Sequence, residues 1–170
     1  MGGCFISDQS PEHPMKTLIV YFTRTGNTRK IVDELQAGLA ADVEMITEEG
    51  SRRGPLGWLK SGRQGARKAD VDIQPIESDP SRYELVVLAS PVWAGNVSAP
   101  MRAFIKRYRD SLPETAVFLT HDSPDVAQAF ADVDDLLGGE PLARGDADGK
   151  TIKDGGHLEA VKVFLEKIGA

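Results

Sequence analysis

The sequence is poor in cysteine and aromatic residues and contains no long hydrophobic run. Its single cysteine, Cys4, cannot form an internal disulfide, which fits a reducing cytoplasm. No apolar stretch approaches the roughly 20 residues that a membrane-spanning helix needs. The first residues lack the basic and apolar regions of a signal peptide. We therefore expect a cytoplasmic protein without a membrane segment.

Two common nucleotide-binding motifs are also missing. The string Gly-x-x-x-x-Gly-Lys-Ser/Thr does not occur, which excludes the phosphate loop of nucleoside-triphosphate-binding proteins. The dinucleotide fingerprint Gly-x-Gly-x-x-Gly is absent after the first predicted strand, where Gly26 stands alone. The sequence has no Cys-x-x-Cys or His-x-x-x-His pair, so it predicts no metal site.

Length and composition indicate one globular domain. The 170 residues are 41% hydrophobic and 27% charged, enough to bury a proper core. Residues 1–14 show no periodicity and contain two prolines near their end. We therefore expect a disordered N-terminal tail over residues 1–14, followed by a single domain over residues 15–170.

The net charge of −6 is unevenly distributed. Residues 51–70 carry six basic residues against one aspartate, a net charge of +5, so the other 150 residues sum to −11. The overall acidity argues against nucleic-acid binding. The basic segment 51–70 either meets a phosphorylated ligand or an acidic partner, or is a solvated helix face.

Strand-like and helix-like patterns alternate along the chain. Apolar runs and period-two patterns predict strands over residues 16–22, 41–47, 84–90 and 116–120, and a weak fifth strand beginning at 140–142. Helical spacing predicts helices over 26–40, 126–137 and 157–168, a further helix after Pro100 and an irregular one near 54–59. This alternation predicts an α/β fold, a doubly wound five-stranded parallel sheet with helices on both faces.

The segment after the first predicted strand is rich in hydroxyl groups. It runs through Thr23, Arg24, Thr25, Gly26, Asn27 and Thr28, and helical spacing starts directly behind it. The first N–H groups of a helix lack internal partners and its dipole favours an anion, so this turn predicts a site for one phosphate monoester. Arg24 would partly offset negative charge, reach toward a nucleotide substrate or point to water. The alternative is an ordinary helix start capped by Thr25 or Asn27.

A second candidate loop follows the third main strand and contains Trp93. In a doubly wound sheet of order 2-1-3-4-5, ligands bind between strands one and three, at their carboxyl ends. Topology therefore brings the threonine turn and the Trp93 loop to one crevice. Trp93 would stack on a planar heterocycle attached to the phosphate, or it is a buried core residue. For Trp58 we expect core or helix packing.

These two loops resemble the flavodoxin family. The resemblance lies in Thr-Arg-Thr-Gly-Asn-Thr at 23–28, Ser-Pro-Val-Trp-Ala-Gly-Asn at 90–96 and Ala-Pro-Met-Arg-Ala-Phe at 99–104. It spans most of residues 16–138, with a poorer match over 48–76. It implies a flavodoxin-like fold, bound FMN and electron transfer, in which the flavin supplies the redox chemistry.

Carried over to this sequence, the resemblance assigns two groups of cofactor-binding residues. The threonine turn would bind the FMN phosphate. The flavin ring would meet the loop formed by Pro91, Val92, Trp93, Ala94, Gly95 and Asn96. In this family a peptide near the glycine changes orientation on flavin reduction, and Gly95 would permit this because it lacks Cβ.

The third family loop corresponds here to Thr120, His121 and Asp122, where many flavodoxins place a second aromatic residue. None stands here, which implies a more open flavin face. His121 would lie near the pyrimidine edge or in solvent.

The sequence leaves the function open between three hypotheses. The first is an electron carrier that docks with a redox partner protein. The second is a flavin-dependent NAD(P)H or quinone oxidoreductase, which the open flavin face and the basic segment 51–70 favour. The third is a flavin-binding regulatory module without turnover.

Overall fold

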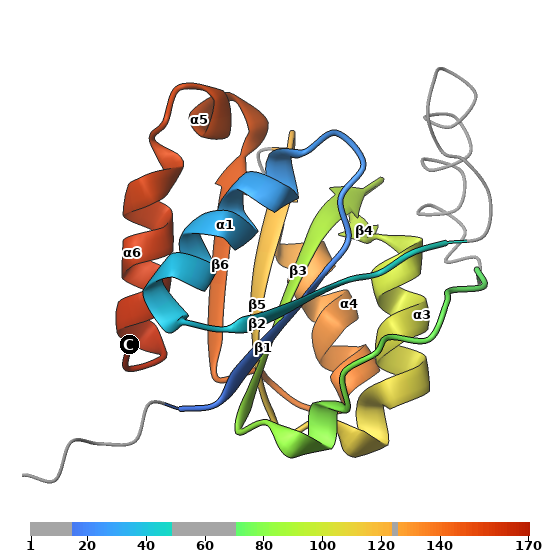
Figure 1. The fold of residues 1–170 in the computed structure, drawn as a ribbon. Helices are drawn as coiled ribbons and strands as arrows, with labels where there is room; N and C mark the ends of the chain where they lie inside the picture. The colour runs from blue at the N-terminus through green and yellow to red at the C-terminus, as the bar shows by residue number, and fades with distance from the viewer. Residues whose placement is uncertain (1–14, 49–70, 124–125) are drawn as a thin grey trace, which may run out of the picture.

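The fold is built on a parallel sheet. A computed structural model describes residues 15–48, 71–123 and 126–170. Its parallel strands are β1 (Thr17–Tyr21), β2 (Asp42–Met45), β3 (Leu85–Trp93), β5 (Glu114–His121) and β6 (Ala143–Asp148). They lie in the order β2-β1-β3-β5-β6 (Figure 1), which confirms the predicted order 2-1-3-4-5. A two-residue strand, β4 (Asn96–Val97), pairs antiparallel with the end of β3.

Helices cover both faces of this sheet (Figure 1). The first face carries α1 (Asn27–Leu39), α5 (Gly149–Lys153) and α6 (His157–Lys167). The second carries α3 (Ala99–Tyr108) and α4 (Ala127–Leu137). Two short 3₁₀ turns, η1 (Pro80–Arg82) and η2 (Arg109–Ser111), lie near the amino ends of β3 and β5.

The buried strands explain why both faces need helices. Along β1, Leu18 and Val20 belong to the apolar cluster under α3 and α4, whereas Ile19 and Tyr21 belong to the cluster under α1 and α6. All of β1 is buried, as expected for a central parallel strand that carries apolar side chains on both faces.

Two strands differ from their predicted bounds. β3 continues beyond residue 90 to Trp93, because Val92 and Trp93 pair with Val97 and Asn96 in a hairpin. The predicted start of the fifth strand at 140–142 is wrong, since β6 spans Ala143–Asp148. Its sequence, Ala-Arg-Gly-Asp-Ala-Asp, lacks a clear apolar pattern because β6 is an edge strand whose fully buried side chains are only the two alanines.

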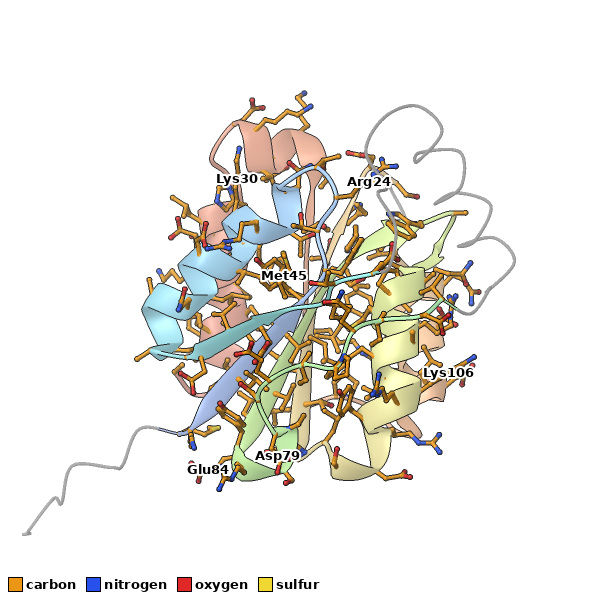
Figure 2. The ribbon with its side chains drawn as sticks, turned by 45° about the vertical axis from the view of Figure 1, so that its right-hand side comes forward. Arg24, Lys30, Met45, Asp79, Glu84 and Lys106 are labelled. Carbon is orange, nitrogen blue, oxygen red and sulfur yellow. The ribbon has the colours of Figure 1, made fainter. Side chains whose placement is uncertain are left out.

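The two ends of the sheet carry different groups. Figure 2 places Arg24 and Lys30 at one end and Asp79 and Glu84 at the opposite end. Arg24 follows the carboxyl end of β1, so its end is the one where the topology predicts ligand binding.

Several predicted features lie outside the described residues: the tail 1–14, the irregular helix near 54–59 with Trp58, and the whole of the basic segment 51–70. Within the described ranges, every helix is too short or too polar to cross a bilayer.

Candidate functional site

The turn between β1 and α1 presents the start of a helix that no side chain caps. Gly26 is the N-cap residue at φ +94°, a left-handed conformation that favours glycine. No side chain bonds to the first amides of α1, so the alternative in which Thr25 or Asn27 caps the helix is wrong. The backbone N–H of Gly26 instead donates to Thr23 Oγ1 at 3.1 Å. The first N–H groups of this 13-residue helix therefore remain open to an anion.

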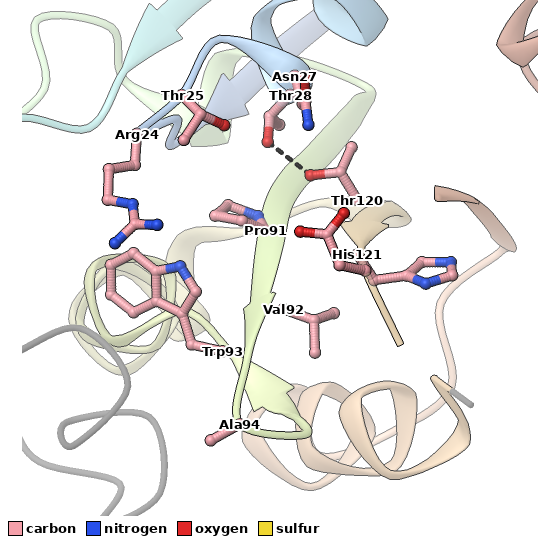
Figure 3. Close-up of a pocket in the computed structure, with 11 residues that line it drawn as sticks. Arg24, Thr25, Asn27, Thr28, Pro91, Val92, Trp93, Ala94, Thr120 and His121 are labelled. Atoms are coloured by element: carbon pink, nitrogen blue, oxygen red, sulfur yellow. Dashed lines mark hydrogen bonds between the residues drawn. The ribbon is translucent and has the colours of Figure 1, made fainter. Parts of the chain in front are cut away.

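The third threonine of the turn connects two elements. Thr28 Oγ1 lies 2.7 Å from Thr120 Oγ1, and both residues are buried (Figure 3). In this pair one hydroxyl donates to the other, so one hydrogen atom of the pair remains for a further acceptor. The contact fixes the start of α1 against the end of β5, and Thr25 is the exposed threonine of the turn.

The Trp93 loop is a tight hairpin rather than an open loop. β3 and β4 are joined by Ala94 and Gly95, which have φ values of +49° and +76°. Positive φ at both central residues is the requirement of a type I′ hairpin turn. Ala94 carries a Cβ in this left-handed region, so its backbone is strained.

Trp93 is packed in the core and also borders the pocket. Its side chain is only 8% exposed, and its ring meets Phe22 edge to face, with centroids 5.5 Å apart and planes at 89°. It belongs to the apolar cluster under α3 and α4, and it also forms part of the pocket wall. The tryptophan is therefore held rigidly by core packing while one part of it faces the site.

The two loops and the end of β5 enclose one pocket of about 340 Å³ (Figure 3). The pocket is lined by residues from all three segments: Arg24, Thr25, Asn27, Thr28, Pro91, Val92, Trp93, Ala94, Thr120, His121 and Asp122. All were expected near a ligand from the sequence.

Four other predicted site residues do not line the pocket. Gly26 and Gly95 shape the two turns, Thr23 bonds within its own turn, and the Asn96 side-chain amide donates to Ala94 O at 3.1 Å. Their place is in supporting the loops.

His121 is engaged on both ring nitrogens. Nδ1 contacts the carbonyl of Ser123, and Nε2 lies 3.0 Å from Asp146 Oδ2 on β6. The ring points away from Trp93 and Arg24 (Figure 3). His121, the last residue of β5, therefore borders the pocket while its imidazole, shielded from solvent, joins the end of β5 to Asp146 on β6.

A fourth segment, which the sequence did not indicate, limits the site beside Asp122. Gly149, at the start of α5, lies so close to the Asp122 carboxylate that a Cβ there would collide with it, and Asn27 Nδ2 is 3.3 Å from the same position. An Asp-Gly pair before a short helix is too common a pattern to have predicted this contact.

Asp148 anchors that segment. Its carboxylate accepts hydrogen bonds from the Thr151 hydroxyl and from the backbone N–H groups of Thr151 and Lys150. These bonds, chiefly the one from the Thr151 side chain, hold the pKa of Asp148 below its ordinary value because they favour the ionised form. Asp148 thereby fixes the start of α5 beside Asp122.

Solved structures share this fold at low sequence identity. A flavoprotein from Lactobacillus acidophilus, crystallised in complex with FMN, is 18% identical over 82% of this chain and 97% of its own, with a TM-score of 0.67. A flavodoxin from Streptococcus pneumoniae is 17% identical over 90% of this chain and 97% of its own, with a TM-score of 0.55. An NAD(P)H:quinone oxidoreductase from Methanothermobacter marburgensis is 13% identical over 90% and 96%, with a TM-score of 0.53.

Neither a protein-family model nor a curated protein matches the sequence. At these identities the structural likeness establishes the fold, and it agrees with the resemblance carried by the two loops. The chain has the flavodoxin fold, with its pocket where the carboxyl ends of β1, β3 and β5 meet.

Proposed function

We propose that this protein binds FMN in the pocket and uses it for electron transfer. One observation carries the proposal: the uncapped start of α1 and the hairpin that bears Trp93 border the same pocket. These two segments lie about 65 residues apart in the sequence. The helix start suits a phosphate monoester, and the hairpin suits a flat ring. The Lactobacillus flavoprotein of the same fold was crystallised with FMN.

The residues present fit the cofactor in size and chemistry. The volume of about 340 Å³ falls within the range of small-molecule sites. The α1 amides and the hydroxyl of Thr25 would hold the phosphate, and Trp93 with Ala94 would hold the ring. Bound FMN supplies the redox chemistry, while the chain orients it and controls access.

The carrier and enzyme hypotheses differ in what reaches the flavin. An electron carrier would exchange electrons with a redox partner protein, and we place this exchange in the cytoplasm because the single cysteine fits a reducing compartment. The enzyme would accept NAD(P)H or a quinone directly. One observation favours the enzyme: the wall formed by Thr120, His121 and Asp122 has no aromatic residue to cover the second flavin face.

Titration of the flavin-free protein tests cofactor binding. We expect FMN to bind at least about tenfold more tightly than riboflavin, because only FMN offers a phosphate to α1; tenfold corresponds to about 1.4 kcal/mol. Flavin fluorescence and calorimetry measure both affinities. Absence of FMN binding, or equal affinity for the two flavins, would refute the proposal.

A second assay separates the two functions. NADPH or NADH oxidation coupled to a soluble quinone selects the enzyme. Reduction only through an added flavoprotein reductase selects the carrier. Tight FMN binding with neither activity supports the regulatory module.

A further inference from the structure

An ion pair is fully buried beneath the pocket hairpin. Arg102 on α3 is 2% exposed, and its Nη2 lies 2.8 Å from Oδ2 of Asp132 on α4, which is 3% exposed. The surrounding side chains belong to the apolar cluster between the sheet and these two helices. Arg102 is one of the largest fully buried side chains in the part of the chain that the structure describes.

Stability alone does not explain this pair. Removing two charges from water costs free energy that their attraction repays only when the other polar atoms are also satisfied, and apolar replacements are often neutral or stabilising. Here Nε and Nη1 of Arg102 find no acceptor among the described residues. A buried ion pair with unsatisfied donors is weak evidence for a stabilising role, so the other contacts of Arg102 bear on what the pair does.

The Arg102 guanidinium also contacts the base of the hairpin. Arg102 Nη2 also donates to the carbonyl of Val97 at 3.2 Å, and Val97 is the β4 residue that pairs with Val92. Next to it, the Ser90 and Ser98 hydroxyls lie 2.8 Å apart in a buried contact. The base of the hairpin is therefore joined to α3 by Arg102 and to α4 through Asp132.

The other end of the same hairpin forms the pocket wall. Trp93 and Ala94 line the pocket, and Ala94 has the strained φ of +49°. A strained backbone persists only where the surrounding structure holds it. An apolar side chain in place of Arg102 would fill the space but would offer nothing to the Val97 carbonyl.

We propose that Arg102 and Asp132 are positioning residues, which fix the Val97 carbonyl and thereby hold the Trp93–Asn96 turn at the geometry that the flavin ring requires. This inference rests on the proposed FMN binding. Neither residue lines the pocket, so both act through the hairpin.

The test replaces both charges at once, in Arg102→Met/Asp132→Leu, because either single change would leave one buried charge unpaired. We expect the flavin-free double variant to melt at or above the wild-type temperature. We expect its FMN affinity to fall at least about tenfold. The matched control is Arg144→Met/Asp134→Leu, which removes a 2.6 Å ion pair between the same helix α4 and β6, away from the hairpin.

The ratio of the affinities for oxidised and reduced FMN distinguishes a positioning role from a purely structural one. Loss of a purely structural contact would leave this ratio unchanged. A hairpin that meets the ring differently in the two states changes this ratio when displaced, and a tenfold change equals about 30 mV in a two-electron potential. We expect a change of at least about threefold in the double variant and none in the control. Spectroelectrochemical titration of the FMN-loaded proteins measures it.

The outcomes separate the two proposals. If wild-type protein does not bind FMN, the proposed function fails. If wild type binds FMN and the folded double variant keeps both affinities, or the control loses as much, the positioning role is refuted. Should Arg102→Met/Asp132→Leu not fold, Arg102→Gln/Asp132→Asn serves instead. This variant keeps a polar pair, but the glutamine side chain is too short to reach the Val97 carbonyl. We expect the same changes in FMN affinity and in the affinity ratio.

Discussion

At the scale of single residues, Trp93 shows how a pocket wall is built from core packing. The ring is almost fully buried and rests edge-on against Phe22, yet it remains part of the pocket wall. A tryptophan held in this way loses little conformational freedom on binding a flat ligand, because its rotamer is already fixed. The same burial means that a substitution at this position affects stability as well as binding.

Trp93→Ala separates these two contributions when it is compared with Trp93→Phe. We expect the alanine variant to lose about 3–5 kcal/mol of unfolding free energy, the range for large aromatic truncations in cores. Its FMN affinity should fall about tenfold, since a stacked aromatic pair contributes up to about 1.5 kcal/mol. Trp93→Phe should lose less of each. Denaturant unfolding and flavin titration measure the two effects, and unchanged FMN affinity in Trp93→Ala would contradict the assignment.

Gly26 offers a cleaner test of the phosphate turn. Its φ is +94° and a Cβ there would meet nothing within 4 Å, so Gly26→Ala adds only backbone strain, about 1–2 kcal/mol. We expect this variant to bind FMN several-fold more weakly because the turn must shift away from its left-handed conformation.

The control is Gly138→Ala, at the end of α4, where φ is +78° and a Cβ would likewise meet nothing. It should have a similar loss of stability with unchanged FMN affinity. Equal FMN binding by both variants, measured by fluorescence, would mean that the turn does not hold the phosphate.

At the scale of elements, the junction of β6 and α5 packs against the residues that line the pocket. α5 has only five residues and begins at Gly149, beside Asp122 and Asn27. A helix this short does not persist by itself, so its position depends on packing and on its cap. Asp148 provides that cap through three hydrogen bonds.

The cap makes stability depend on pH in a defined direction. Because the pKa of Asp148 is lower in the folded state, its ionised carboxylate adds to the free energy of unfolding at pH values above the unfolded pKa, near 3.8. This stabilisation disappears as the pH falls through the folded-state pKa. We expect Asp148→Ala to lower the melting temperature at pH 7, with a smaller difference from wild type at about pH 3. Asp154→Ala, at the other end of α5, is the control and should show no such loss. A deficit that is the same at both pH values would contradict this role.

Prediction from sequence succeeded for the elements with strong local patterns. β1, α1 and the core of β3 carry apolar runs or helical spacing that their burial explains. The continuation of β3 into a hairpin was missed, since a Trp-Ala-Gly-Asn turn resembles any loop until its partner strand is known. β6 was misplaced because an edge strand needs few apolar residues.

At the scale of the whole molecule, the doubly wound strand order assembles the pocket from segments that are far apart in the sequence. It places the ends of β1, β3 and β5 side by side, so segments near residues 25, 93 and 121 share one pocket. This was predictable because right-handed crossovers leave few arrangements of such a sheet. The Thr28–Thr120 contact, the His121–Asp146 contact and the Arg102–Asp132 pair were not predictable, because each joins side chains whose facing depends on the finished packing.

A ligand that contacts three strand ends and α1 should stabilise the molecule as a unit. FMN at 100 times its Kd adds about 2.7 kcal/mol to the free energy of unfolding if it binds only the folded state. For a domain of this size, that corresponds to a rise of roughly 5–10 °C in melting temperature. Riboflavin at the same concentration should give a smaller rise because it leaves the α1 amides without an anion. Differential scanning calorimetry measures both, and equal rises, or none, would show that the uncapped start of α1 does not bind the phosphate.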